Sequence, residues 1–364
     1  MSFRPPRFVA LTAAAAVLAL TAACGSDSDE PAQQSGAESE PAAAQELRLG
    51  FFANVTHATP LVGVTEGFFE TSLGDTKLTT QVFNAGPSAI EALLGESLDA
   101  SYIGPNPAIN AFAKSNGEAI RIIAGTTSGG AALVVRPEIN SAEDLRGTTL
   151  ATPQLGNTQD VALRAWLKEE GLETSVEGGG DVTISPTENA TTLQLFRDGG
   201  IQGAWLPEPW ASRLVLEAGA KVLVDEATLW PEGQFVTTHL IVRTEFLDQY
   251  PGTVQALLEG HVEATQWIDE NQDQAKTDVN AKIAELAGKP LPQEVIDRAW
   301  DNLTITFDPI ASSLEKSAAD AADAGLIEKP ELRGIYDLAA LNEILESRGI
   351  AAVSDAGLGA SGSG

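Results

Sequence analysis

The stretch from Thr152 to Gly171 combines a polar turn with the start of a helix, a combination that suits anion binding. It reads TPQLGNTQDVALRAWLKEEG. Asn157 is a good N-cap, and Asp160 follows three residues later, where an acidic side chain can reach back to the cap. A helix start carries about half a positive charge and has free N–H groups, so it attracts anions and polar groups. The competing interpretation is an ordinary capped helix whose donors face water.

Similar polar turns follow other apolar runs along the chain. Strands are predicted at residues 47–52, 78–83 and 100–103, each followed by a polar turn and a helical pattern, which indicates a parallel sheet with crossover helices. Ligands bind at the carboxyl ends of strands in open parallel sheets. We therefore expect one cleft formed by the turns at 54–57, 86–88, 104–106, 128, 156–159, 208–210 and 237–239.

The order of these elements predicts two α/β lobes, with the second lobe inserted in the first. We expect the chain to cross between lobes near Arg136 and near Phe235. The first lobe then comprises residues 46–136 and 235–350, of which the second part is mostly helical, and the second lobe comprises residues 137–234.

The amino terminus has the pattern of an export signal. Arg4 and Arg7 precede an apolar stretch and Cys24, the only cysteine. The segment resembles the lipobox of bacterial lipoproteins, in which the cysteine becomes the lipid-carrying first residue, although the large apolar residue, Leu20, is four positions before Cys24. We expect a signal peptide at 1–23 and lipid attachment at Cys24.

Two segments are too polar or too small in their side chains to bury a core. Residues 24–45 are predicted to form a flexible tether, and the Gly/Ser/Ala-rich residues 351–364 a disordered tail. The net charge of −29 argues against nucleic acid or an anionic membrane face as a partner.

The sequence lacks the motifs and residue spacings that are typical of catalytic and metal-binding sites. His57, His239 and His261 are the only histidines, and none has a close ligand spacing with another. There is no GxSxG, Walker loop or HExxH motif. His57 and His239 lie on candidate cleft loops, where a ligand-donor role and a structural hydrogen bond are both open. We expect no catalysis, no cofactor and no metal.

Two residues beside the turn at 208–210 have alternative roles. Trp210 can wall a ligand or pack at the hinge. Glu208 is held between two prolines and would repel a simple anion if it faced the cleft. Glu208 therefore either makes a structural bond or faces a donor or cationic part of the ligand, and Asp160 raises the same question.

Several ordered motifs carry a family resemblance: AGPSAIEALLGESLDASYIGPNP, GTTSGGAALVVR, SAEDLRGTTLATPQLGNTQDVALRAWL and GAWLPEPW. Together they resemble the solute-binding lipoproteins of ABC importers for nitrate, sulfonates and taurine, over about residues 46–350. The resemblance implies a two-lobe periplasmic-binding-protein-like fold of type II, with a small oxoanion in the inter-lobe cleft. With Glu208 and Trp210 added, the expected ligand-binding residues are Asn54, His57, Gly86, Ser88, Asn106, Ser128, Asn157, Thr158, Gln159, Glu208, Trp210, Thr237 and His239.

The expected function is capture of a small oxoanion outside the cytoplasmic membrane. Helix starts and hydroxyls would bind it without lysine or arginine, which suits a weakly basic sulfonate. An aliphatic sulfonate or taurine is favoured, and nitrate, bicarbonate, a thiamine pyrimidine precursor or a secreted enzyme of the same fold are the alternatives. The expected partners are the permease and ATPase subunits of the importer and the membrane that holds the lipid anchor. We expect a monomer.

Overall fold

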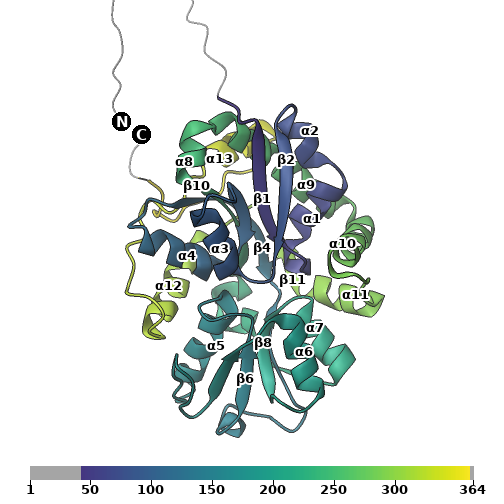
Figure 1. The fold of residues 1–364 in the computed structure, drawn as a ribbon, viewed down its shortest axis with the longest axis vertical. Helices are drawn as coiled ribbons and strands as arrows, with labels where there is room; N and C mark the ends of the chain where they lie inside the picture. Colours follow the sequence, from purple (N-terminus) through teal and green to yellow (C-terminus); the bar gives the residue numbers. More distant parts are fainter. Residues whose placement is uncertain (1–41, 361–364) are drawn as a thin grey trace, which may run out of the picture. The chain divides into compact units, whose positions relative to one another are not determined.

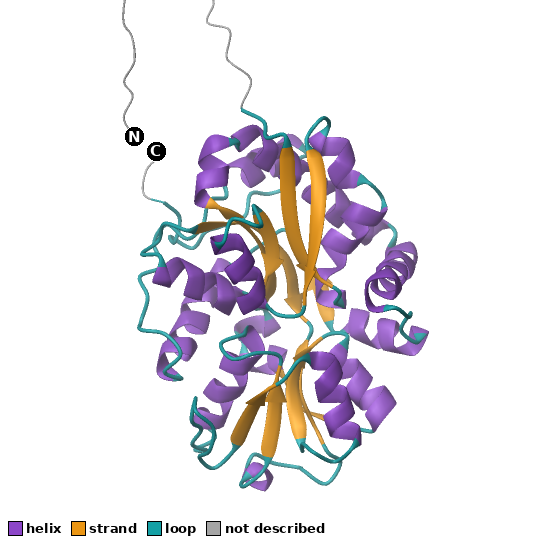
Figure 2. Cartoon of the chain, viewed as in Figure 1, coloured by secondary structure: helices purple, strands orange, loops and turns teal. Residues whose placement is uncertain are grey.

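Two separate β-sheets define two lobes in the computed structural model, which describes residues 42–360 (Figures 1 and 2). Both sheets belong to one compact unit. Parallel pairs joined by helices occur in each sheet, as the recurring strand, turn and helix pattern predicts.

The six-stranded sheet of the first lobe has the strand order β11-β4-β10-β3-β1-β2. β1 pairs in parallel with β2 and β3, whereas β10 runs antiparallel to β3 and β4. The parallel strands place the turns after β1, β2 and β3 at the same edge of the sheet. The strands are β1 (Glu46–Phe52), β2 (Lys77–Phe83), β3 (Ala100–Ile103), β4 (Ile120–Gly129), β10 (Val236–Arg243) and β11 (Leu303–Ile305).

The five-stranded sheet of the second lobe has the order β7-β6-β8-β5-β9. β6 pairs in parallel with β7 and β8, and β5 is antiparallel to β8 and β9. The strands are β5 (Ala131–Val135), β6 (Thr149–Thr152), β7 (Thr183–Pro186), β8 (Gly203–Pro207) and β9 (Lys221–Asp225).

The first crossing between the lobes lies at Gly130, not near Arg136 as expected. β5 pairs with β8 and so belongs to the second lobe. A single residue separates β4 from β5, and Gly129 and Gly130 both have positive φ, +75° and +73°. Glycine adopts this backbone without strain, which lets the chain leave one sheet and enter the other directly. The crossing back precedes β10, close to the expected Phe235.

Helices cover both faces of the first sheet. α3 and α4 pack together and contact it, and α1 and α2 pack on the long helix α9 (Figure 1). The helical pattern expected after the first strand forms two helices, α1 and α2, because Gly67 between them has a φ of +75°. The bounds are η1 (Val55–His57), α1 (Ala58–Thr65), α2 (Phe68–Leu73), α3 (Gly86–Leu94), α4 (Pro105–Lys114), α8 (Thr244–Gln249), α9 (Pro251–Glu270), α10 (Gln272–Ala287), α11 (Gln293–Asp301), η5 (Ala311–Ser313), α12 (Leu314–Asp323) and α13 (Ala339–Ser347).

The second sheet has a separate apolar core on each face. Leu133 and Val135 of β5 pack into one core with residues of α5, and Val134 packs into the other with residues of α6 and α7. This is the period-two alternation of a strand buried on both sides. The helices are η2 (Glu143–Leu145), α5 (Thr158–Glu169), α6 (Asn189–Arg197), α7 (Trp210–Ala218), η3 (Glu226–Leu229) and η4 (Pro231–Gly233).

The ends of the described chain are more ordered than expected. Ala44, in the last part of the expected tether, is buried, and its N–H donates to Thr253 Oγ1 at 2.7 Å. In the expected tail, Leu358 is buried and its carbonyl accepts from Gly334 N. Both segments are held because each buries an apolar side chain and pairs its backbone. The expected signal peptide, Cys24 and the tether up to residue 41 lie outside the described residues.

Within residues 42–360, no helix combines the length and the apolar character needed to cross a bilayer.

Candidate functional site

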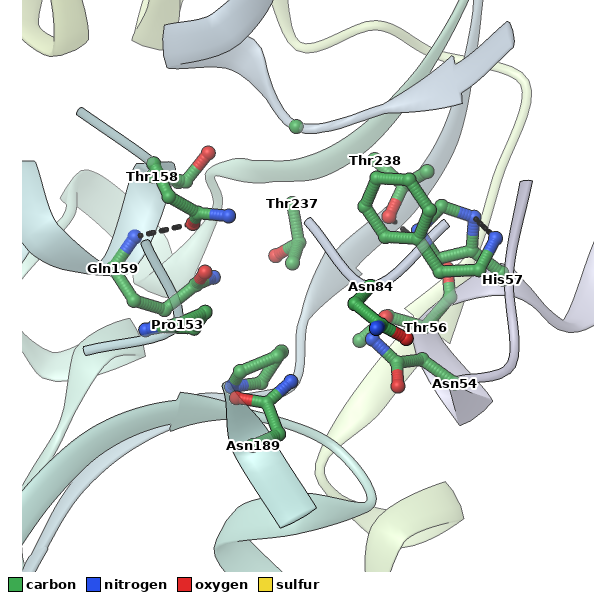
Figure 3. Close-up of a pocket in the computed structure, with 14 residues that line it drawn as sticks. Asn54, Thr56, His57, Asn84, Pro153, Thr158, Gln159, Asn189, Thr237 and Thr238 are labelled. Atoms are coloured by element: carbon green, nitrogen blue, oxygen red, sulfur yellow. Dashed lines mark hydrogen bonds between the residues drawn. The ribbon is translucent and has the colours of Figure 1, made fainter. Parts of the chain in front are cut away.

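A small polar cavity lies where the carboxyl-terminal turns of both sheets meet (Figure 3). Its empty space is about 350 Å³, part of it open to solvent. Amide and hydroxyl side chains dominate its lining, and none of the lining residues is Asp, Glu, Lys or Arg. The lining residues are Phe52, Asn54, Thr56, His57, Asn84, Gly104, Pro153, Asn157, Thr158, Gln159, Asn189, Pro207, Thr237 and Thr238.

Helix starts from both lobes converge on this cavity. Asn157 is the N-cap of α5, Gly104 is the N-cap of α4, and Asn189 is the first residue of α6. The starts of α5 and α6 leave backbone N–H groups without intrahelical partners, whereas α4 contributes only the N–H of Asn106 and its dipole, because Pro105 and Pro107 have no N–H. The cavity is therefore suited to an anion although no basic side chain lines it.

Thr158 has an unpaired buried hydroxyl in the lining of the cavity. It is the first residue of α5. The neighbouring amides of Asn157 and Gln159 are satisfied within the turn, by Gln154 O and by Asn157 Oδ1. Buried polar groups are rarely left unpaired in proteins. Thr158 thus offers a solute two donors, its N–H and its hydroxyl.

The amide groups of Asn157 and Asn54 have their orientation fixed by donors of the protein. Asn157 Oδ1 accepts from Gln159 N at 3.2 Å, and Asn54 Oδ1 accepts from Trp210 Nε1 at 2.9 Å. An indole or backbone N–H can only donate, so the oxygen of each amide must face it. The NH₂ group of each side chain therefore remains available as a donor.

His57 is a neutral donor for the same reason. Its Nδ1 accepts from Phe52 N at 3.3 Å, so the proton of the neutral ring lies on Nε2. Burial lowers the pKa of His57 to about 3, which keeps the ring uncharged at neutral pH. His57 therefore makes a structural hydrogen bond through Nδ1 and also lines the cavity, where Nε2 can donate.

A β-bulge brings two consecutive residues of β10 to the cavity. The register of β10 against β4 shifts on both sides of Thr238, and Thr237 and Thr238 both line the cavity. In a regular strand they would point to opposite faces. Their hydroxyls donate to Gly129 O and Thr56 O, so each presents only its oxygen lone pairs to a solute.

The carboxylate of Asp160 faces the protein and not the cavity. It accepts from Thr152 Oγ1, Gly156 N and Arg164 Nε at 2.9 to 3.1 Å and is fully buried. Its charge is neutralised by the ion pair with Arg164. Asp160 therefore stabilises the turn that positions Thr158.

Glu208 is likewise engaged within the protein. It is 2% exposed, and its carboxylate accepts from Ser212 N, from Ser212 Oγ and from Asn302 Nδ2. Burial raises the pKa of Glu208, while these donors oppose the rise. Of the two roles left open for Glu208, the structure shows the structural bond.

Six of the expected ligand-binding residues line the cavity, namely Asn54, His57, Asn157, Thr158, Gln159 and Thr237. The other seven do not. Their side chains, where they have one, pack against or bond to other parts of the protein; they are Gly86, Ser88, Asn106, Ser128, Glu208, Trp210 and His239.

The reasons differ among these seven residues. His239 is fully buried, and its Nε2 lies 3.1 Å from Pro309 O, beyond the bulge that turns Thr237 and Thr238 to the cavity. Burial lowers the pKa of His239 to about 4. Asn106 Nδ2 donates to Ser317 O at 2.9 Å, and Gly86 lies against Pro107.

Ser88, Ser128 and Trp210 do not line the cavity but contact or pair with elements that surround it. Ser88 Oγ makes only a long contact, 3.5 Å, to Gln154 Oε1 of the second lobe. Ser128 is buried in the pairing of β4. Trp210 acts through Asn54, which its indole N–H orients.

Eight lining residues are absent from the expected ligand-binding set, although three of them, Thr56, Gly104 and Thr238, lie within the turns expected to form the cleft. Asn84 and Asn189 had a usable signal, because each follows a strand and lies at or before a helix start, like Asn157. Asn189 Oδ1 is buried without a hydrogen-bond partner, as is the Thr158 hydroxyl. Phe52, Pro153 and Pro207 carried no such signal.

No group of three or more potential metal ligands occurs among the residues that the structure describes.

Comparison with solved structures supports the two-lobe fold. The alkanesulfonate-binding protein SsuA from Xanthomonas axonopodis pv. citri, bound to MOPS, is 20% identical with a TM-score of 0.66, over 80% of this chain and 96% of that one. The periplasmic nitrate-binding protein NrtA from Synechocystis PCC 6803 is 17% identical with a TM-score of 0.64, over 85% and 86%. At this identity the likeness concerns the fold alone.

Sequence relatives include binding proteins for sulfonated solutes. The taurine-binding periplasmic protein of Escherichia coli is 28% identical over 57% of this chain, and the match spans 63% of its own length. A putative aliphatic sulfonates-binding protein of Bacillus subtilis is 25% identical over 91% of this chain and 95% of its length.

A family model matches residues 40–286, which is more than half of the chain. The matched range includes both crossings between the lobes and every residue that lines the cavity. The chain therefore belongs to the NMT1-like family.

Proposed function

We propose that this chain is the extracytoplasmic solute-binding protein of an ABC importer, and that the cavity takes the headgroup of an aliphatic sulfonate. One observation carries the proposal. The acceptor atoms of Asn54, His57 and Asn157 are occupied by donors of the protein, so these side chains present N–H groups to the cavity, where Thr158 adds two more donors.

A sulfonate matches this arrangement in charge and in hydrogen bonding. It has three acceptor oxygens and one negative charge, and it does not need a basic partner because helix starts and neutral donors stabilise the charge. The names of two relatives, for taurine and for aliphatic sulfonates, point to the same headgroup.

An uncharged tail is favoured over the ammonium group of taurine. Asp160 and Glu208 are both engaged within the protein, and no carboxylate lines the cavity. An ammonium group would be dehydrated without a counter-charge, which is costly. Thr237, Thr238 and Asn189 offer it only neutral oxygens.

The remaining parts of the proposal concern where the protein acts. Cys24 is proposed as the lipid attachment site, with the following segment as a tether to the extracytoplasmic face of the membrane. The permease and ATPase subunits of the importer are the proposed partners of a monomeric, non-catalytic protein.

The test is an exchange of a donor for a carboxylate at the helix cap. Asn157→Asp keeps the oxygen that caps α5 but replaces the NH₂ donor with a negative charge. Loss of one charge-assisted hydrogen bond, about 1.5–3 kcal/mol, predicts butanesulfonate affinity at least tenfold weaker by isothermal titration calorimetry. Asn116→Asp makes the same charge change at an exposed site outside the cavity and serves as the control.

The panel of solutes decides between the alternatives. Butanesulfonate, taurine, nitrate, bicarbonate and an aminopyrimidine are compared with the same protein. Binding of only the aminopyrimidine, unaffected by Asn157→Asp, would overturn the proposal. Turnover of any bound solute would show an enzyme instead.

A further inference from the structure

A second cavity shares a wall with the sulfonate cavity. Its empty space is about 820 Å³, partly open to solvent, more than twice that of the first. We call it the tail groove; its principal lining residues are Leu193, Arg197, Trp210, Arg213, Ile283 and Leu291. They come from α6, α7 and the region of α10 and α11, and so from both lobes.

Three chain segments line both cavities with neighbouring residues. Phe52 and Asn54 line the sulfonate cavity, and Ala53 between them lines the tail groove. Likewise, Asn189 lines the sulfonate cavity and the next residue, Ala190, lines the tail groove. In the third segment, Pro207 faces the first cavity and Pro209 the groove.

The two cavities are therefore lined by residues that are adjacent or two apart in the same segments. The hydrogen bond from Trp210 Nε1 to Asn54 Oδ1 at 2.9 Å also joins a groove residue to a residue of the sulfonate cavity.

The chemistry of the tail groove suits an apolar group. Most of its lining residues are apolar, and its two arginines are already paired: Arg197 and Arg213 each contact Glu217 at 2.8 Å. The guanidinium of Arg213 also lies 4.6 Å from the centre of the Trp210 ring. The charges of the two arginines are thus already compensated, and the third basic lining residue, Lys289, is exposed. Leu193, Ile283 and Leu291 belong to the packed cores and add apolar surface to the groove lining.

We propose that the tail groove binds the hydrocarbon tail of the solute whose sulfonate occupies the first cavity. The solute is then an alkanesulfonate with a chain of several carbons, whose tail passes beside the intact Asn54–Trp210 pair into the groove. This inference rests on the proposed function, because it takes the headgroup site as given. The groove is then a specificity determinant, because affinity would depend on the length of the tail.

The experiment compares methanesulfonate with octanesulfonate by isothermal titration calorimetry. Each methylene buried in the groove strengthens binding by up to about fourfold, so octanesulfonate should bind at least tenfold more tightly. Ala287→Trp places an indole in the groove at an exposed position and should remove most of this gain while methanesulfonate binds as before. Ala281→Trp, on the same helix but outside the groove, should keep the gain.

The outcomes separate this inference from the proposed function. Equal affinity for both sulfonates would overturn the tail groove and leave the headgroup site intact. Absence of binding for both would overturn the headgroup site itself. A tenfold gain that survives Ala287→Trp would place the tail elsewhere.

A fluorescence readout of Trp210 covers the case in which Ala287→Trp does not fold. Octanesulfonate should change the emission of the wild type more than methanesulfonate does, and Trp210→Phe should abolish the difference. Identical spectra with both solutes would contradict a tail that lies beside Trp210.

Discussion

Asn302 Nδ2 donates a 2.7 Å hydrogen bond to Glu208 Oε1, and this bond joins the first lobe to the second. Gly130, where the chain crosses between the lobes, bonds to both residues: its N–H donates to Asn302 O, and its carbonyl accepts from Glu208 N, each at 2.8 Å. A Cβ at Gly129 would lie 2.9 Å from Asn302 O, too close for any residue but glycine. The crossing is therefore a tightly bonded joint, and its side-chain bond can be tested.

Asn302→Ala should lower the free energy of unfolding by about 1–3 kcal/mol, because it leaves a buried carboxylate short of one donor. Chemical denaturation measures the loss. Glu208→Gln removes the charge, so Asn302→Ala should cost less in that background. An equal cost in both backgrounds would mean that the bond itself contributes little.

Gly104→Ala should weaken sulfonate binding without unfolding the protein. A Cβ at residue 104 would lie 2.3 Å from Thr158 Oγ1, so the threonine must move away from its position in the cavity. We expect at least tenfold lower affinity by calorimetry. Gly200→Ala, where the nearest atom is 3.4 Å from the added Cβ, is the control. Unchanged affinity in Gly104→Ala would remove Thr158 from the proposed donors.

Glu226→Gln should change how stability depends on pH. Burial raises the pKa of Glu226 to about 7, above its ordinary value of 4.5, although Trp205 Nε1 donates to it at 2.7 Å. A raised carboxyl pKa favours the folded state below about pH 4.5, and this contribution is lost as the pH rises through 7. From pH 5 to pH 8 the variant should gain on the order of 2 kcal/mol relative to wild type. Unfolding curves at both pH values give this difference, and a difference independent of pH would contradict the assignment.

Cys24→Ala should release the protein from the membrane fraction. The prediction follows from the signal-like segment that ends at Cys24, outside the described residues. Fractionation of cells that express each form, followed by immunoblotting, is the measurement. Retention of the variant in the membrane fraction would show that another segment anchors the chain.

Local signals predicted the parts of the site that depend on local geometry. Asn157 caps α5 as expected because an N-cap is decided within a few residues. The turns after β1 and β6 line the cavity because each follows a parallel strand at the carboxyl edge of its own sheet.

Other features depend on contacts that are distant in the sequence. The run 131–135 reads as a buried strand in either lobe, and only its pairing with β8 assigns it to the second. The bulge at Thr238 determines that Thr237 faces the cavity and His239 the protein, and no local residue pattern announces it. The partners of Asp160 and Glu208 likewise appear only in three dimensions.

The absence of charged side chains from the cavity lining has a consequence for ions that are common outside cells. Sulfate and doubly charged phosphate would fit a site for three oxygen atoms, but the Born cost of stripping water from an ion rises with the square of its charge. The neutral amides and helix starts must therefore offset about four times as much dehydration cost for a dianion as for a monoanion of the same size. A lining without lysine or arginine thus favours monoanions over the abundant dianions.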